Sequence, residues 1–123
     1  MKVLIVDDAA ITRLLLTNML RELGYKVVGD AVDGLDAVVK CKVLMPEVVF
    51  LDITMPGMDG LTAIPKLLKN DPRIKIVICS ALAQRNIVVE AMQKGAINYI
   101  VKPFQKETLE RVMKEVQGMA NEI

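Results

Sequence analysis

Histidine and tryptophan are absent from the chain, and only 3% of its residues are aromatic. Without histidine, a histidine general base, a phosphohistidine intermediate and a Ser-His-Asp triad are excluded. Two cysteines without any histidine also exclude an ordinary zinc site, and we interpret Cys41 and Cys79, which lie among apolar neighbours, as core residues. Any chemistry must therefore use carboxylates, hydroxyls and lysines.

An excess of charge of one sign is also lacking. Sixteen Lys and Arg against fifteen Asp and Glu give a formal net charge of +1, so the chain has no electrostatic basis for binding nucleic acid. Its longest wholly apolar runs have four residues, far fewer than the roughly 20 that cross a bilayer. The N-terminal strand pattern reaches Asp7 too soon for a signal peptide, so we expect no membrane insertion and a cytoplasmic location.

Short β-branched runs alternate with helical patterns along the 123 residues, which have the length of one domain, 1–123. The runs lie at 3–6, 27–28, 48–51, 76–79 and 99–101. Four of them are apolar at consecutive positions, as in strands covered on both faces, while residues 26–30 are mixed and typical of an edge strand. The pattern predicts an α/β fold, a (βα)5 doubly wound five-stranded parallel sheet.

Helical spacing of apolar residues fills the intervals between these strands. The first helix carries Leu16, Met19, Leu20 and Leu23 and is expected to end at Gly24. The third is less regular, because Pro65 cannot donate a hydrogen bond to the carbonyl of Leu61. We expect that helix either to kink or to start late.

A polar residue follows each of four predicted strands: Asp7, Asp52, Ser80 and Lys102. The carboxyl ends of parallel strands meet at one edge of a sheet, where ligands bind in this architecture. A single such residue is commonly a loop or helix-cap residue, and Asp7 with Asp8 could simply begin the first helix. Two carboxylates, a hydroxyl and a lysine at the same edge indicate a site.

Four segments carry a resemblance to a known family: Val6-Asp7-Asp8, Leu51 to Gly60, Cys79-Ser80-Ala81 and Val101-Lys102-Pro103-Phe104. In this order and spacing, the chain resembles the receiver domain of two-component response regulators. The resemblance implies a flavodoxin-like fold with strand order 2-1-3-4-5. That order places the strands ending at Asp7 and Asp52 side by side, where repulsion between their carboxylates favours a divalent cation.

The resemblance also implies the role of each site residue. Asp52 would accept a phosphoryl group, and Lys102 would neutralise its oxygens. Mg²⁺, with Mn²⁺ as a substitute, would be held by Asp8, Asp52 and the main-chain carbonyl of Thr54, with Asp7 acting through a water. The Lys102-Pro103 peptide bond would be cis.

A switch is implied as well. Ser80 would bind the phosphoryl group and Tyr99 would then rotate inward, changing the face formed by the fourth helix, fifth strand and last helix. On that face, Ile87-Val88-Val89 cannot all point into one core, so we expect at least one of them to be exposed.

The function implied is that of a stand-alone signalling protein without an output domain, and not an enzyme. It would receive phosphate from a sensor histidine kinase and signal by switched protein binding. Three segments most resemble single-domain chemotaxis regulators: Asp7-Asp8-Ala9-Ala10, Ser80-Ala81 and residues 101–105. This implies a chemotaxis kinase upstream and a flagellar or archaellar motor switch as target. We expect a monomer, with dimerisation on phosphorylation as a further possibility.

Several alternatives share some of these features. A phosphorelay intermediate that passes phosphate to a histidine phosphotransfer protein has the same pocket, as does a receiver excised from a longer regulator. A haloacid-dehalogenase-like phosphatase needs a second aspartate where this chain has Thr54. A flavodoxin-like electron carrier needs a hydroxyl-rich loop and more aromatic residues than this chain has.

Overall fold

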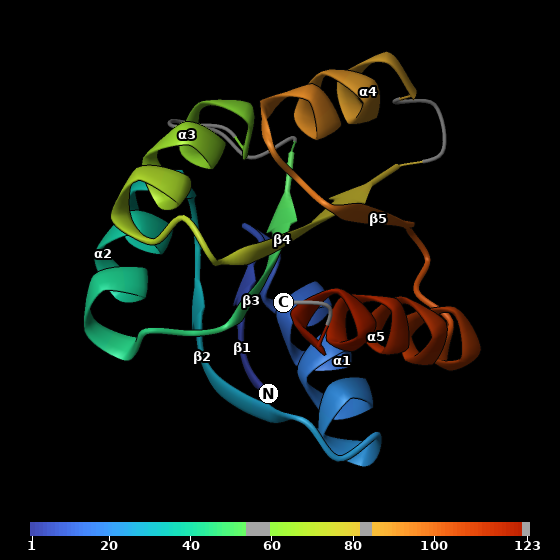
Figure 1. The fold of residues 1–123 in the computed structure, drawn as a ribbon. Coiled ribbons are helices and arrows are strands. Elements are labelled where there is room, and N and C mark those ends of the chain that lie inside the picture. The colour runs from blue at the N-terminus through green and yellow to red at the C-terminus, as the bar shows by residue number, and fades with distance from the viewer. Residues whose placement is uncertain (54–59, 82–84, 122–123) are drawn as a thin grey trace.

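The computed structural model describes residues 1–53, 60–81 and 85–121. Strands and helices alternate along the chain: β1 (Lys2–Val6), α1 (Ala10–Glu22), β2 (Lys26–Ala31), α2 (Gly34–Leu44), β3 (Val48–Asp52), α3 (Gly60–Asn70), β4 (Lys75–Ser80), α4 (Arg85–Lys94), β5 (Asn98–Val101) and α5 (Lys106–Asn121). All strand pairs are parallel, in the order β2-β1-β3-β4-β5. The predicted fold and strand order are confirmed (Figure 1).

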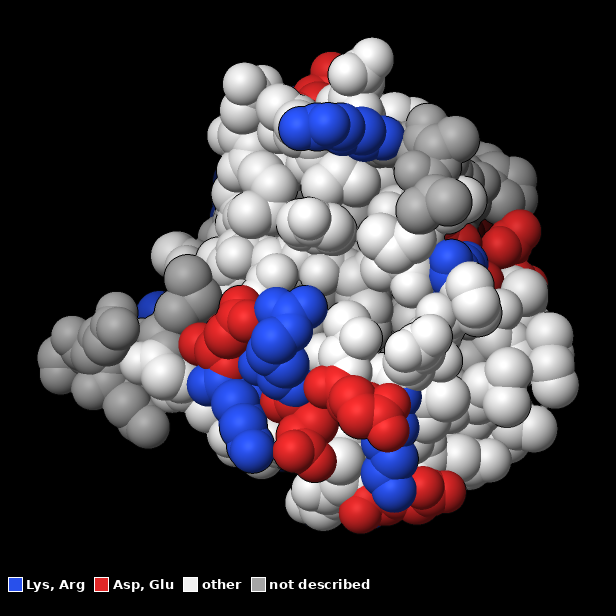
Figure 2. Space-filling model, turned by 90° about the vertical axis from the view of Figure 1, so that its right-hand side faces the viewer, with Lys and Arg blue, Asp and Glu red and all other residues white. Residues whose placement is uncertain are grey.

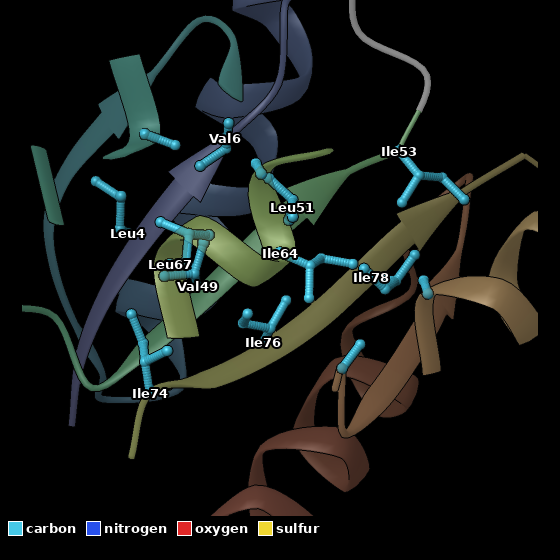
Figure 3. Close-up of a cluster of buried hydrophobic side chains, with 14 of the residues drawn as sticks. Leu4, Val6, Val49, Leu51, Ile53, Ile64, Leu67, Ile74, Ile76 and Ile78 are labelled. Atoms are coloured by element: carbon cyan, nitrogen blue, oxygen red, sulfur yellow. The ribbon is translucent and has the colours of Figure 1, made fainter. Parts of the chain in front are cut away.

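Each side of the sheet carries its own layer of helices. Alternate residues of the strands point to opposite layers: Leu4 and Val49 pack with residues of α2, α3 and α4, whereas Val3 and Phe50 pack with residues of α1 and α5. Figure 3 shows the first of these clusters, in which Ile64 and Leu67 of α3 lie over the central strands. Both predicted core cysteines are buried, Cys41 in the first cluster and Cys79 in the second.

Two helix ends test the expectations from the sequence. Helix α1 ends next to Gly24, which has a positive φ of 94°, as its position predicted. Helix α3 contains Pro65 in its interior and already begins at Gly60, so the late start that we allowed for is wrong. The missing Pro65 hydrogen bond is outweighed by the burial of Ile64 and Leu67, which are fully buried on either side of Pro65.

None of the helices within the described ranges has the length and hydropathy of a membrane-spanning helix. Of the three residues Ile87, Val88 and Val89, Val89 is 49% exposed and Val88 is buried. The expectation that at least one of them is exposed is therefore confirmed.

Candidate functional site

The four polar residues picked out by the strand pattern all lie at the carboxyl edge of the sheet. Asp7 follows β1, Asp52 and Ser80 are the last residues of β3 and β4, and Lys102 follows β5. The pairing of β1 with β3 places the first two strand ends side by side. At the other end of the site, the Lys102 amide donates to the Ser80 carbonyl at 2.8 Å, which joins the ends of β4 and β5.

Three carboxylates meet at this edge. One oxygen each from Asp7, Asp8 and Asp52 lies within 4.8 Å of the others. Asp7 and Asp52 are 2% exposed, whereas Asp8 faces solvent. Because the cluster offers only hard oxygen ligands and one open side, it fits a cation such as Mg²⁺, which takes a few carboxylates and keeps several waters.

The Lys102 ammonium lies between the two buried carboxylates. Its Nζ donates to Asp7 Oδ2 at 2.8 Å and to Asp52 Oδ2 at 3.2 Å. Burial alone would lower the pKa of Lys102, but the Asp7 hydrogen bond and the charge of Asp52 outweigh that effect, and the pKa is raised. Lys102 is therefore a charged group held directly against the carboxylates.

Asp7 is fixed from several directions. Its side chain accepts a hydrogen bond from the Ala9 amide at 2.8 Å, just ahead of α1, whose N-cap Ala9 provides no side-chain cap. Asp7 thus contacts the residue that precedes α1, whose first turn contains no acidic residue. Burial raises the pKa of Asp7, against the lowering effect of the Lys102 hydrogen bond.

Arg13 supports the site and was not identified from the sequence. Its Nη1 donates to the main-chain oxygen of Asp7 at 2.8 Å, and its Nε pairs with Asp30 Oδ2 at 2.8 Å. The guanidinium therefore holds the peptide that joins Asp7 to Asp8 against the end of β2. No spacing rule reveals this link, because it depends on how α1 lies across β2.

The remaining predicted residues have different positions. Ser80 is 2% exposed and lines a hollow of about 690 Å³ together with Val88, Met92 and Tyr99. Tyr99 is 49% exposed and lies in the edge strand β5. Thr54 lies outside the described residues. The Lys102-Pro103 peptide bond is cis, as the resemblance implied.

Comparisons with known proteins agree with this geometry. The family described as response regulator receiver domain matches residues 3–114. The chemotaxis protein CheY of Thermotoga maritima is 46% identical over 115 residues, covering 94% of this chain and 96% of its own. That of Bacillus subtilis is 44% identical over 120 residues, covering 98% of both chains.

Solved structures of response regulators are also similar to this chain. A chain in the CheX–CheY–BeF3–Mg²⁺ complex of Borrelia burgdorferi is 38% identical, with a TM-score of 0.85, over 93% of this chain and 87% of that chain. The response regulator domain of Thermotoga maritima CheB has a TM-score of 0.83 at 31% identity, covering 96% and 94%. The site at the carboxyl edge thus belongs to a protein of the response regulator receiver domain family, with CheY chemotaxis proteins among its relatives.

Proposed function

We propose that this protein is a single-domain response regulator that accepts a phosphoryl group on Asp52 and signals by switched protein binding in chemotaxis. The observation that supports this proposal most directly is the position of the Lys102 ammonium. It lies 2.8 Å from Asp7 and 3.2 Å from Asp52, against a cluster of three carboxylates. Family membership and the CheY relatives support the same function. The phosphoryl donor would be a sensor histidine kinase.

The three carboxylates and the Lys102 ammonium leave a negative charge that a divalent cation would balance. Asp8 and Asp52 would hold Mg²⁺ or Mn²⁺ directly, with Asp7 through a water and the carbonyl of Thr54 as a further ligand. The ion would neutralise the carboxylates and the oxygens of the incoming phosphoryl group. The three carboxylate oxygens within 4.8 Å of one another support this assignment.

The reaction would be a direct displacement at phosphorus. A carboxylate oxygen of Asp52 forms the new O–P bond while the P–N bond to the kinase histidine breaks, and the imidazole nitrogen keeps the electron pair and takes up a proton from water. Lys102 neutralises charge on the phosphoryl oxygens, which is the main requirement of phosphoryl transfer. The protein needs no general base, because Asp52 attacks as a carboxylate.

Phosphorylation would be transmitted through Ser80 and Tyr99. The Ser80 hydroxyl would bind a phosphoryl oxygen, and the Tyr99 ring would turn into the hollow that both residues line. The volume of that hollow, about 690 Å³, leaves room for a tyrosine ring. The ring is half-exposed in this structure, so the proposed rotation would bury it.

The target would dock on the face formed by α4, β5 and α5. Figure 2 looks at this side and shows a largely uncharged zone between one basic side chain near the top and a belt of charged side chains below. Met92 and Val89 of α4 contribute exposed apolar surface there, and the charged residues of α5 include Glu107, Arg111 and Lys114. We propose a motor-switch protein as the target, with the regulator remaining a monomer before phosphorylation.

The first experiment is to incubate the protein with Mg²⁺ and acetyl phosphate and measure its intact mass. We expect one phosphoryl adduct that requires Mg²⁺, is absent from Asp52→Asn and persists in Asp36→Asn, which removes a carboxylate outside the cluster. Acetate leaves as the Asp52 O–P bond forms. No adduct on a folded protein that binds Mg²⁺ would contradict the proposal.

A second measurement tests the pathway. The phosphorylated protein is expected to bind a motor-switch protein more tightly than the unphosphorylated form. Transfer of its phosphate to a histidine phosphotransfer protein, without such binding, would identify a phosphorelay intermediate instead.

A further inference from the structure

The outward face of α2 is aliphatic. Leu35, Val39 and Val43 follow one another at intervals of four residues, and they are 59%, 52% and 72% exposed. The residues that this helix buries are small: Gly34, Ala37 and Cys41. A surface helix normally has the opposite pattern, with its large apolar residues inward and polar residues outward.

The aliphatic surface continues beyond both ends of the helix. Val32 precedes α2 and is 47% exposed, and Met45 follows it and is 68% exposed. Single exposed aliphatic residues are ordinary, but a row of them along one helix is typical of a surface that another molecule covers. We call Leu35, Val39 and Val43 the α2 stripe.

One flank of the α2 stripe is basic. Between α2 and α3 lies a hollow of about 440 Å³ lined by Val38, Lys42, Lys66, Lys69 and Asn70. Among the residues that the structure describes, no carboxylate pairs with these three lysines. The other flank is already balanced, because Lys40 pairs with Asp36 at 3.3 Å.

We infer that the α2 stripe and the basic hollow form a docking site for an amphipathic helix that carries carboxylates along one edge. Its apolar face would cover the stripe, and its carboxylates would lie over Lys42, Lys66 and Lys69. The site goes beyond the proposed function, since it uses none of the phosphorylation residues. It lies in the α2 and α3 part of the molecule, away from the face of α4, β5 and α5 (Figure 1).

Charge and shape favour this partner over two others. In an antiparallel pair of α2 helices, two-fold symmetry would place the lysine flanks of both copies on the same side, where like charges repel. A lipid surface is attracted by the same lysines, but it does not enter a hollow between two helices as a side chain of a helical partner does.

The test uses two synthetic helical peptides with the same leucine face, one with glutamates and one with lysines along its edge. Each is titrated into isotope-labelled protein while amide chemical shifts are recorded. We expect the acidic peptide to bind at least about tenfold more tightly and to shift amides of α2 and α3. Val39→Glu is expected to weaken its binding about tenfold, whereas Leu15→Glu, at a similarly exposed aliphatic residue of α1, retains it.

Charge reversal supplies the decisive comparison. In the triple variant Lys42→Glu, Lys66→Glu and Lys69→Glu, the preference is expected to invert in favour of the basic peptide. Thermal unfolding and phosphorylation by acetyl phosphate verify that each variant is folded.

The inference is overturned by equal affinity of both peptides, by the lack of binding, or by shifts confined to other helices. It is also overturned if Val39→Glu abolishes self-association in sedimentation experiments or binding to phosphatidylglycerol vesicles. Those two results would assign the stripe to a second copy or to a membrane.

Discussion

At the residue scale, Lys102 has two roles that oppose each other. Its ammonium stabilises the buried carboxylates of Asp7 and Asp52 in the absence of metal, and it would also neutralise the phosphoryl group. The same ammonium competes with any cation for those oxygens and repels it. Binding of the ion and transfer of phosphate should therefore respond in opposite directions when this side chain is removed.

We predict that Lys102→Met raises the Mg²⁺ affinity about tenfold and slows phosphorylation by acetyl phosphate at least about tenfold. Isothermal titration gives the first quantity, and the time course of intact mass gives the second. Lys106→Met, which removes a surface lysine paired with Glu22, serves as control and should change neither. Weaker Mg²⁺ binding by Lys102→Met would contradict the competition argument.

Arg13 is the second residue whose removal is informative. Its Nη1 donates a hydrogen bond to the main-chain oxygen of Asp7. The Arg13 side chain is largely buried, with 16% of it exposed. We predict that Arg13→Met lowers the free energy of unfolding by about 2 kcal/mol, because a charged hydrogen bond is lost. Faster exchange of the Ala9 amide, which donates to Asp7, should accompany this loss.

Urea unfolding and amide hydrogen exchange measure these two effects. The control is Asp30→Asn, which removes only the charge of the exposed partner of Arg13 and keeps the bond to Asp7. Its free energy of unfolding should therefore fall by less than about 1 kcal/mol. If Arg13→Met and Asp30→Asn lowered the free energy of unfolding equally, the ion pair and not the Asp7 contact would be the stabilising interaction.

At the element scale, the beginning of α3 lies against the end of β3 at Asp52, the proposed phosphoryl acceptor. A Cβ atom at Gly60 would be 2.6 Å from the Asp52 main-chain oxygen and 2.7 Å from the Ile53 Cα. Both neighbours are backbone atoms, which cannot move aside as a flexible side chain can. Only glycine allows α3 to approach β3 this closely.

We predict that Gly60→Ala destabilises the protein by about 1–3 kcal/mol and slows phosphorylation of Asp52. The matched variant is Gly118→Ala in α5, where an added Cβ has no atom within 4 Å, so it should stabilise the helix by up to about 1 kcal/mol. Chemical denaturation compares the two. If Gly60→Ala left the free energy of unfolding unchanged, β3 and α3 would be able to move apart with little loss of stability.

The sequence predicts the positions of some helices and strands better than those of others. Strands β1, β3 and β4 are almost entirely buried and have clear apolar runs, and β5 has the run Tyr99-Ile100-Val101. Asp7, Asp52, Ser80 and Lys102 could therefore be placed at strand ends from the sequence. The start of α3 was not predictable, because burial of Ile64 and Leu67 overrides the local effect of Pro65. The link from Arg13 to Asp7 joins two elements in space, which periodicity does not show.

The whole molecule responds to alkaline pH through its buried thiols. Burial, with a smaller contribution from Asp71, raises the pKa of Cys41 from 9.0 to about 11. The unfolded chain therefore loses the thiol proton near pH 9, while the folded protein keeps it. The stabilisation is fully present below pH 9 and is lost as the pH rises toward 11.

We predict that the free energy of unfolding falls as the pH increases from 9 to 11, with about 2 kcal/mol due to Cys41. Urea unfolding at several pH values measures the dependence. In Cys41→Ala the curve should be flatter by that amount, although the absolute stability is lower because a cavity forms. Burial also raises the pKa of Cys79, so part of the slope should remain. Parallel curves for the two proteins would contradict the prediction.

The pair formed by Lys102 and Asp7 spans 95 positions of the chain. Protein synthesis therefore delivers the three carboxylates long before it delivers the lysine, which follows the last strand. A chain still leaving the ribosome with β1, β3 and β4 complete has Asp52, the proposed acceptor, but not the Lys102 ammonium. We expect such unfinished chains to be phosphorylated only slowly, so that the proposed signal comes only from chains that include Lys102.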